Sequence, residues 1–567
     1  MRITALARID ACARAALVCL GVLAMATGCQ DPASATAVGA AGADAAGADS
    51  AGDAVSIPAD TRRAETVRVD AEPPVDSAPP AEASVSAPDA APLPPSRPLA
   101  RCDLAPPILN TARLRIEGTR FRDAADRQVI LRGVNAGGRS KMPPFLPFPF
   151  AESGFPGQET APPFALALTE YLDRVVEWGH DTLRLPFTWE AVEPLRGEYD
   201  AVYLERYRAV ISAAGARGLR IIVDFHQDLW ARPYCGDGAP LWTLPEPVPA
   251  LPAAADCKQW FLSYITDPQH VVFPAFDRFW ANEDGVRDAY LALWRHMAES
   301  TADLDAVIGY EPLNEPHPGT HDETTWGAEI LTPFFAEVAG AIRERAPGLP
   351  VFFESSGVDA TDQTFTLTVP AGGAMVWAPH YYDPRVFLGL PINENFSARG
   401  PVGLLARQGS AWSVPVFVGE FGAAADAPGT ALYLRKVLDA LDAEALNGTV
   451  WQYSTAADDW NLEGFSITGP DGVETPAVEE VIRAYPLAIA GELDAFVFDR
   501  EARAGTLRFA AVPGVSELAA PARLYPSGLI VTVRGEGVCG RYDTASGRLL
   551  LRTENTSTVE VEFRPAR

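Results

Sequence analysis

Two glutamates stand where the chain is expected to deliver side chains into a pocket. Glu315 lies in the stretch 309–316 (GYEPLNEP), and Glu420 lies in the stretch 415–422 (PVFVGEFG). Each follows a short apolar run and is followed within two residues by a proline or glycine, which is how a strand ends. Two carboxyls presented in this way can cut a glycosidic bond, because one protonates the leaving oxygen while the other attacks or activates water opposite it. For either glutamate alone, a strand-end ion pair is the structural alternative.

The elements that must position these glutamates alternate between short apolar runs and amphipathic segments. Helical periodicity separates most of the apolar runs, as in 201–216 and 429–445. Eight strands with intervening helices predict a (β/α)8 TIM barrel, whose active site gathers at the carboxyl ends of the strands. A doubly wound open sheet is the alternative, but we find no glycine-rich phosphate turn of the dinucleotide type. The eight expected strands are 129–135, 182–186, 220–226, 307–310, 351–354, 375–380, 416–420 and 448–453.

The pattern changes after residue 485. Strand-like runs follow one another with only turns between them, which predicts a small C-terminal all-β sandwich over residues 486–567. The catalytic barrel is then expected over residues 99–485. The expected strands of the sandwich are 495–498, 506–509, 528–533, 548–551 and 559–563.

Residues 1–29 have the pattern of a lipoprotein signal peptide. A basic front is followed by the apolar run 15–26, which is too short to span a bilayer because a span needs about 20 residues. The run ends in Ala-Thr-Gly before Cys29, which predicts lipidation of Cys29; ordinary cleavage nearby is the alternative. Residues 30–98 are rich in Ala, Pro and Asp and are expected to form a disordered tether. We therefore expect an exported bacterial cell-envelope lipoprotein, at the outer membrane or cell surface, or a secreted protein.

The charge and the cysteine content of the chain indicate which classes of ligand and which disulfides to expect. With 46 basic and 74 acidic residues, the net charge of −28 argues against nucleic acid as a partner. Four cysteines lie beyond the signal, and the expected disulfides are Cys235–Cys257 and Cys102–Cys539. Their spacing has no metal-site pattern. We expect no metal, no cofactor and a monomer.

Four motifs carry a resemblance to a known family. The stretches 182–189 (TLRLPFTW), 314–316 (NEP), 379–382 (PHYY) and 419–422 (GEFG) resemble glycoside hydrolase family 5. More narrowly, the chain resembles the endoglycoceramidases of that family. This narrower similarity covers about residues 112–567 and rests on 224–228 (DFHQD), 264–268 (YITDP), 273–280 (FPAFDRFW) and the appended sandwich.

The resemblance implies separate roles for the two glutamates. Glu315 is expected to be the general acid/base, which requires a raised pKa so that the carboxyl arrives protonated. Glu420 is expected to be the nucleophile, held ionised by Arg184, His380 or Tyr382. The family is retaining, which implies carboxyls about 5–5.5 Å apart and a covalent glycosyl-enzyme intermediate.

Further residues are expected to bind the sugar. Asn314 would contact the 2-hydroxyl, and Trp451 would offer a flat face to a sugar ring; a turn-capping asparagine and a core tryptophan are the alternatives. Asp228 and Lys141 resemble residues with which endoglycoceramidases hold the first sugar. The remaining candidates are His226 and His380 at strand ends, Arg184, Tyr382, Trp260 as a further sugar contact, and His317, where many relatives place an aromatic residue.

Two loops are more apolar than solvated connections usually are, namely 142–150 (MPPFLPFPF) and 241–252 (LWTLPEPVPALP). A ceramide-linked substrate needs such a surface, although packing over the barrel is the alternative. We therefore expect hydrolysis of the bond between oligosaccharide and ceramide in glycosphingolipids. The alternatives are a β-1,4-glucanase or another β-glucosidase, such as one acting on steryl glucosides, and a catalytically inactive surface carbohydrate-binding protein, which the intact glutamates argue against.

Overall fold

The computed structural model describes residues 93–566, except 106–112, 358–364, 388–389, 457–462 and several positions between 259 and 268. The predicted signal peptide, Cys29 and most of the predicted tether lie outside the described residues, as does part of the stretch 264–268. Within the described ranges, none of the helices combines the length and apolar character that crossing a membrane requires.

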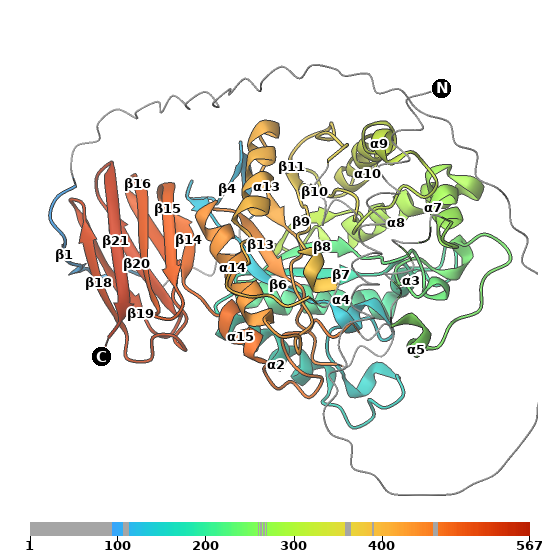
Figure 1. The fold of residues 1–567 in the computed structure, drawn as a ribbon, viewed down its shortest axis with the longest axis horizontal. Coiled ribbons are helices and arrows are strands. Elements are labelled where there is room, and N and C mark those ends of the chain that lie inside the picture. The colour runs from blue at the N-terminus through green and yellow to red at the C-terminus, as the bar shows by residue number, and fades with distance from the viewer. Residues whose placement is uncertain are drawn as a thin grey trace, which may run out of the picture. The chain divides into compact units, whose positions relative to one another are not determined.

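Eight parallel strands form a barrel in which neighbours along the chain are neighbours in space (Figure 1). A parallel bridge between Trp377 and Val416 joins the two ends of the sheet and closes it. The expected TIM barrel is therefore confirmed. Its strands are β6 (Arg132–Asn135), β7 (Thr182–Phe187), β8 (Arg220–Phe225), β9 (Val307–Glu311), β10 (Val351–Phe353), β11 (Met375–Trp377), β12 (Phe417–Val418) and β13 (Asn447–Val450).

Amphipathic helices connect the strands. In α4 (Ala201–Ala216), the Asp200 carboxylate caps the first turn by accepting from the N–H groups of Val202 and Tyr203. The other long helices are α2 (Phe164–Glu177), α8 (Val286–Thr301), α10 (Thr332–Arg343), α13 (Arg399–Trp412) and α14 (Thr430–Ala443). Shorter ones are α3 (Trp189–Val192), α5 (Ala254–Cys257), α7 (Phe273–Trp280), α9 (Glu323–Trp326), α12 (Pro384–Phe387), α15 (Pro476–Val481), the 3-10 turns η1 (Gly138–Lys141), η2 (Ala151–Ser153), η3 (Arg232–Tyr234), η4 (Leu241–Thr243) and η5 (Glu283–Gly285), and the π-turn η6 (Gly327–Leu331).

Two mainly antiparallel sheets form the C-terminal domain. The first has the order β1-β18-β21-β16-β15, and the second has the order β2-β19-β20-β17-β14-β5-β4-β3. The sequence prediction missed β14, β17 and β19, the last two of which carry glycine and charged residues that are depleted in strands. The C-terminal strands are β14 (Tyr485–Ile489), β15 (Gly491–Asp499), β16 (Ala504–Ala511), β17 (Gly514–Ala519), β18 (Leu529–Arg534), β19 (Val538–Asp543), β20 (Arg548–Thr553) and β21 (Ser557–Pro565).

Strands from the start of the described chain complete both sheets. Val129 of β5 pairs with Ala488 of β14, and Cys539 of β19 pairs with Ala100 of β2. Phe121 of β4 stacks on Phe352 inside the barrel, within an apolar cluster that plugs the end where the barrel strands begin. The N-terminal strands therefore link barrel and sandwich. They are β1 (Arg97–Pro98), β2 (Ala100–Arg101), β3 (Arg115–Glu117), β4 (Arg120–Arg122) and β5 (Gln128–Val129).

Two disulfides are present. Cys102 is bonded to Cys539, with the two Cα atoms 5.6 Å apart, and this bond ties the first described segment to β19. Cys235 is bonded to Cys257, with a Cα separation of 5.1 Å. The second bond therefore joins the two ends of the apolar insertion that contains residues 241–252.

Candidate active site

The two glutamates meet at the carboxyl ends of their strands. Glu315 follows β9, and Glu420 follows β12. A carboxylate oxygen of Glu315 and one of Glu420 lie within 4.8 Å of each other. Glu315 has a left-handed backbone, with φ at 41°, which is uncommon for a glutamate. The side-chain amide of Gln227 holds this turn by donating to the backbone oxygens of Asn314 (2.9 Å) and Glu315 (3.0 Å).

Glu420 is buried and accepts two hydrogen bonds. Arg184 Nη1 donates to its Oε1 at 2.7 Å, and the Tyr382 hydroxyl donates to its Oε2 at 2.8 Å. Hydrogen bonds of this kind favour the ionised carboxylate. The surroundings of Glu420 therefore suit a nucleophile.

Arg184 is fully buried and connects the strand ends. Its guanidinium makes a bidentate pair with Glu311, at 2.8 and 3.1 Å, and also donates to the side-chain oxygens of Asn135 (3.0 Å) and Asn314 (2.9 Å). A buried cation requires such compensation. Burial raises the pKa of Glu311 to about 7, although Arg184 acts in the opposite direction.

Glu315 has a different environment from Glu420. Its side chain is 25% exposed, against 6% for Glu420. Although its side chain is more exposed than that of Glu420, partial loss of solvation raises the pKa of Glu315 to about 8, and the negative charge of Asp228 adds to this effect. A carboxyl with this pKa is mostly protonated at neutral pH, which is what a general acid requires. The structure thus supplies one carboxyl with a raised pKa and one that is held by hydrogen bonds from Arg184 and Tyr382.

A second group of predicted residues gathers beside the glutamates. Lys141 Nζ donates to Asp228 Oδ2 and lies 4.5 Å from the centre of the Trp451 ring. The His226 ring also stacks on the Trp451 ring, with centroids 4.9 Å apart and planes inclined by 7°. Although burial acts against it, hydrogen bonding to Asp224 and Asp228 raises the pKa of His226 to about 10. This cluster combines charges, hydrogen-bonding groups and a flat ring, as a sugar site does.

The remaining candidates are placed as follows. Asn314 is held by Arg184 and donates to the backbone oxygen of Gln227 at 3.1 Å, so its amide is fixed beside the acid. His317 is buried against Phe273, with ring centroids 4.8 Å apart, and its Nδ1 accepts from the N–H of Gly319. Trp260 is only half-buried and lies against Tyr264, 6.5 Å between centroids. His380 lies between the two glutamates.

Several site residues were missed from the sequence. Glu463 accepts from the indole N–H of Trp451 at 2.8 Å and lies 3.5 Å from Lys141 Nζ, but no motif surrounds it. Glu354 accepts from the backbone N–H of Glu315 at 2.8 Å. A usable signal existed for Glu354, because it ends the predicted strand 351–354.

Three groups among the described residues are close enough to offer ligands to one cation, and each contains a buried histidine with two acids. In one group Lys141 already pairs with Asp228. In the others Arg184 pairs with Glu311 or Glu420. One acid of each group is therefore already paired with a cation of the protein itself. The groups are His226/Asp228/Asp237, Glu311/Glu354/His380 and Glu315/His380/Glu420.

The two apolar loops differ. In 142–150, the side chains of Met142, Leu146, Phe148 and Phe150 are all buried, so this loop packs onto the protein core. In the insertion 241–252, Leu241 is 45% exposed and Leu251 is 51% exposed. Of the two loops, only the second has large apolar side chains that are exposed to solvent.

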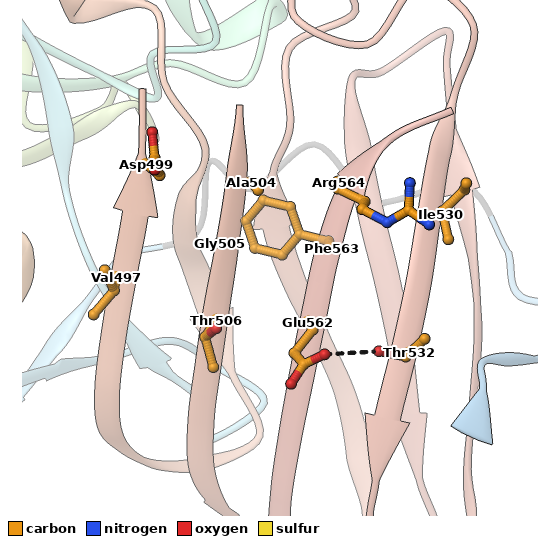
Figure 2. Close-up of a pocket in the computed structure, with 10 residues that line it drawn as sticks. All are labelled: Val497, Asp499, Ala504, Gly505, Thr506, Ile530, Thr532, Glu562, Phe563 and Arg564. Carbon is orange, nitrogen blue, oxygen red and sulfur yellow. Dashed lines mark hydrogen bonds between the residues drawn. The ribbon is translucent and has the colours of Figure 1, made fainter. Parts of the chain in front are cut away.

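A hollow of about 390 Å³ lies away from these residues, on the five-stranded sheet (Figure 2). Figure 2 shows Thr506, Glu562 and Thr532 on neighbouring strands, with the Thr532 hydroxyl donating to Glu562. Gly505 leaves room here for the Phe563 ring, because a Cβ would lie 2.5 Å from its Cζ. The lining contains no histidine, tyrosine or tryptophan, and Glu562 is half exposed. We therefore place the chemistry in the barrel.

Comparisons with known proteins agree with this placement. The model of the cellulase family (glycosyl hydrolase family 5) matches residues 148–457, and that of the glycoside hydrolase family 5 C-terminal domain matches residues 483–563. Endoglycoceramidase I of Rhodococcus hoagii is 28% identical over 459 residues, which are 74% of this chain and 82% of that protein. The structure of endo-glycoceramidase II from Rhodococcus sp. with a five-membered iminocyclitol is 26% identical, with a TM-score of 0.61, and covers 79% of this chain and 99% of that one. The structure of the same enzyme with ganglioside GM3 has a TM-score of 0.64 at 24% identity, over 80% and 100% of the chains, and supports the fold alone.

Proposed function

Because the chain belongs to glycoside hydrolase family 5, we propose that it cleaves the bond between oligosaccharide and ceramide in glycosphingolipids by a retaining mechanism. The observation that carries the reaction type is the separation of at most 4.8 Å between oxygens of Glu315 and Glu420. Inverting enzymes need about 6.5–9.5 Å between the carboxyls to admit a water molecule, whereas retaining enzymes need about 5–5.5 Å.

In the first step, a Glu420 oxygen attacks the anomeric carbon while Glu315 transfers its proton to the glycosidic oxygen. The bond to the aglycone breaks, the aglycone leaves as an alcohol, and the sugar is esterified to Glu420. In the second step, ionised Glu315 takes a proton from water, whose oxygen displaces Glu420 from the anomeric carbon. The sugar leaves with retained configuration, and both carboxyls return to their starting states.

Two features support the glycolipid substrate. The relatives that match most of this chain include endoglycoceramidases. In addition, the insertion after β8 carries exposed Leu241 and Leu251 and is closed at its base by Cys235–Cys257. A fixed apolar loop at the carboxyl end of the barrel suits a ceramide, because burial of alkyl chains is favourable by about 0.8 kcal/mol per CH₂. Cys29 would hold the enzyme at a membrane.

The test compares substrates directly. Purified protein is incubated with ganglioside in detergent micelles, with steryl glucoside and with cellulose, and the products are identified by mass spectrometry. We expect intact oligosaccharide and ceramide from the ganglioside. Hydrolysis of cellulose or steryl glucoside alone would overturn the glycolipid substrate but not the glycosidase, and sugar binding without any hydrolysis would support an inactive carbohydrate-binding protein.

A further inference from the structure

His380 lies among three acids, Glu315, Glu354 and Glu420, which follow strands β9, β10 and β12. Its Nδ1 is 2.9 Å from Glu315 Oε1 and 3.6 Å from Glu420 Oε2, and its Nε2 is 3.2 Å from Glu354 Oε1. Glu354 follows β10 directly and is 2% exposed. Its other oxygen accepts from the backbone N–H of Glu315 at 2.8 Å. One buried carboxyl thus touches both the backbone of the acid/base and the imidazole beside it.

The hydrogen-bonding capacity of His380 determines what Glu354 must be. Burial lowers the pKa of His380 to about 4, so the ring is neutral and has one donor and one acceptor nitrogen. If Nδ1 donates to Glu315, then Nε2 presents a lone pair to Glu354. An ionised carboxylate has no proton to offer that lone pair, and two facing lone pairs in a buried site are unfavourable.

His380 Nε2 is buried without a hydrogen-bond partner among the described residues, a need that a protonated Glu354 can meet. Its Oε1 hydroxyl can donate to His380 Nε2 while its Oε2 still accepts from Glu315. Burial raises the pKa of Glu354 well above its usual range, and the negative charge of Glu311, with that of Glu315 when it is ionised, adds to this effect. Gly419 leaves space for the contact, because a Cβ at that position would lie 2.9 Å from Nε2. The charged groups acting on His380 are Glu420, Arg184, Asp224 and His226, and Arg184 also acts on Glu354.

We propose that Glu354 is a positioning residue that acts as a neutral carboxylic acid: it donates a hydrogen bond to His380 Nε2 and thereby keeps the His380 proton on Nδ1, facing Glu315. The Nδ1–H group then donates to Glu315 Oε1, so the acid proton of Glu315 must reside on Oε2. In the opposite tautomer, Nδ1 would accept the Glu315 proton and compete with the leaving group for it. This inference rests on glycosidase activity and does not require ceramide as the aglycone.

Two substitutions of Glu354 distinguish a hydrogen-bonding role from a role in packing alone. Glu354→Gln keeps a neutral group, whose NH₂ can donate to Nε2 and whose oxygen can accept from Glu315. Glu354→Met has similar size and provides neither bond. Ser355→Ala is a control for disturbance at the same strand end, since Ser355 is the next residue along the chain and accepts a hydrogen bond from the Trp377 indole at 3.1 Å.

Activity is measured on two glycosides of the sugar that the wild-type enzyme releases, one with an alkyl leaving group and one with a dinitrophenyl leaving group that needs no protonation. For the alkyl glycoside, we expect kcat/KM of Glu354→Gln within about threefold of wild type and that of Glu354→Met reduced about tenfold or more, the loss of one buried hydrogen bond. For the dinitrophenyl glycoside, Glu354→Met should lose much less. Equal losses for Gln and Met, equal losses on both substrates, or full activity of Glu354→Met would each overturn the proposal.

The tautomer of His380 can also be determined directly, in the absence of substrate. Nitrogen-15 NMR of the seven histidines, with the His380 signals assigned from a His380→Ala sample, distinguishes a proton on Nδ1 from one on Nε2. We expect the Nδ1–H form in the wild type and in Glu354→Gln, and the Nε2–H form or a mixture in Glu354→Met. An Nε2–H or doubly protonated ring in the wild type at neutral pH would refute the role assigned to Glu354.

Discussion

The alkaline limit of activity should belong to Glu315. In the first chemical step this carboxyl must be protonated, and its pKa is raised to about 8 by burial and by Asp228. We therefore expect kcat/KM for a substrate with an alkyl leaving group to be constant through neutral pH. Above about pH 8 it should fall about tenfold per pH unit, since kcat/KM reports the ionisation of the free enzyme.

The raised pKa of Glu315 determines how much of the enzyme carries the acid proton at neutral pH. At pH 7 a carboxyl with a pKa of about 8 is about 90% protonated, whereas one at the ordinary value of 4.5 would be about 0.3% protonated. The environment of Glu315 therefore raises the competent fraction about 300-fold at neutral pH. Asp228→Asn removes the negative charge that helps to raise this pKa. The alkaline limb of that variant should move to lower pH, beyond any uniform loss from weaker sugar binding.

The assay is kcat/KM from about pH 5 to about pH 10 at constant ionic strength, with alkyl and dinitrophenyl glycosides side by side. The dinitrophenyl substrate should lack the limb near pH 8 in its bond-breaking step, because its leaving group needs no proton. A limb that persists unchanged with this substrate would show that another group titrates. A limb near pH 5, or an upward move in Asp228→Asn, would refute the reasoning about burial and charge.

Two further predictions test the nucleophile and the anchor. Glu420→Gln should leave no more than a trace of hydrolysis, about 10⁵-fold or more below wild type, because an amide cannot form the glycosyl ester; circular dichroism checks that the variant is folded, and substantial residual turnover would reassign the nucleophile. Cys29→Ser should move the protein from the membrane fraction to the soluble fraction in cell fractionation, and unchanged membrane association would reject lipidation at Cys29.

Local sequence predicted the barrel well because its strands are short buried runs bounded by chain-breaking residues. The expected helix 201–216 coincides with α4, whose apolar face and capping Asp200 are both local signals. The expected strand 129–135 is instead two strands, since Val129 pairs with Ala488 and Arg132–Asn135 belongs to the barrel. Pairings over hundreds of residues leave no periodic trace in short strands such as Ala100–Arg101, which pairs with Cys539 and Gly540.

In the active site, too, the residues marked by local sequence patterns were predictable, and those placed by long-range contacts were not. Glu315, Glu420, Arg184 and His380 follow or lie on apolar runs, so their common placement at the carboxyl ends of parallel strands was predictable. Glu463 lies on a loop beyond β13, and its contact with Trp451 depends on how that loop folds back. The exposed or buried state of apolar loops is equally non-local, as Phe148 and Leu251 show.

The early strands β1 and β2 have their partners at the far end of the chain, in β18 and β19. During synthesis these residues leave the ribosome before the rest of the barrel and sandwich, and their partner strands are made more than 400 residues later. A nascent chain that lacks its final hundred residues would also leave β5 without β14, next to the first barrel strand. Although separate family models match the barrel and the C-terminal domain, the two domains should fold as one cooperative unit. A barrel without its sandwich should be prone to aggregation through the exposed strand edges.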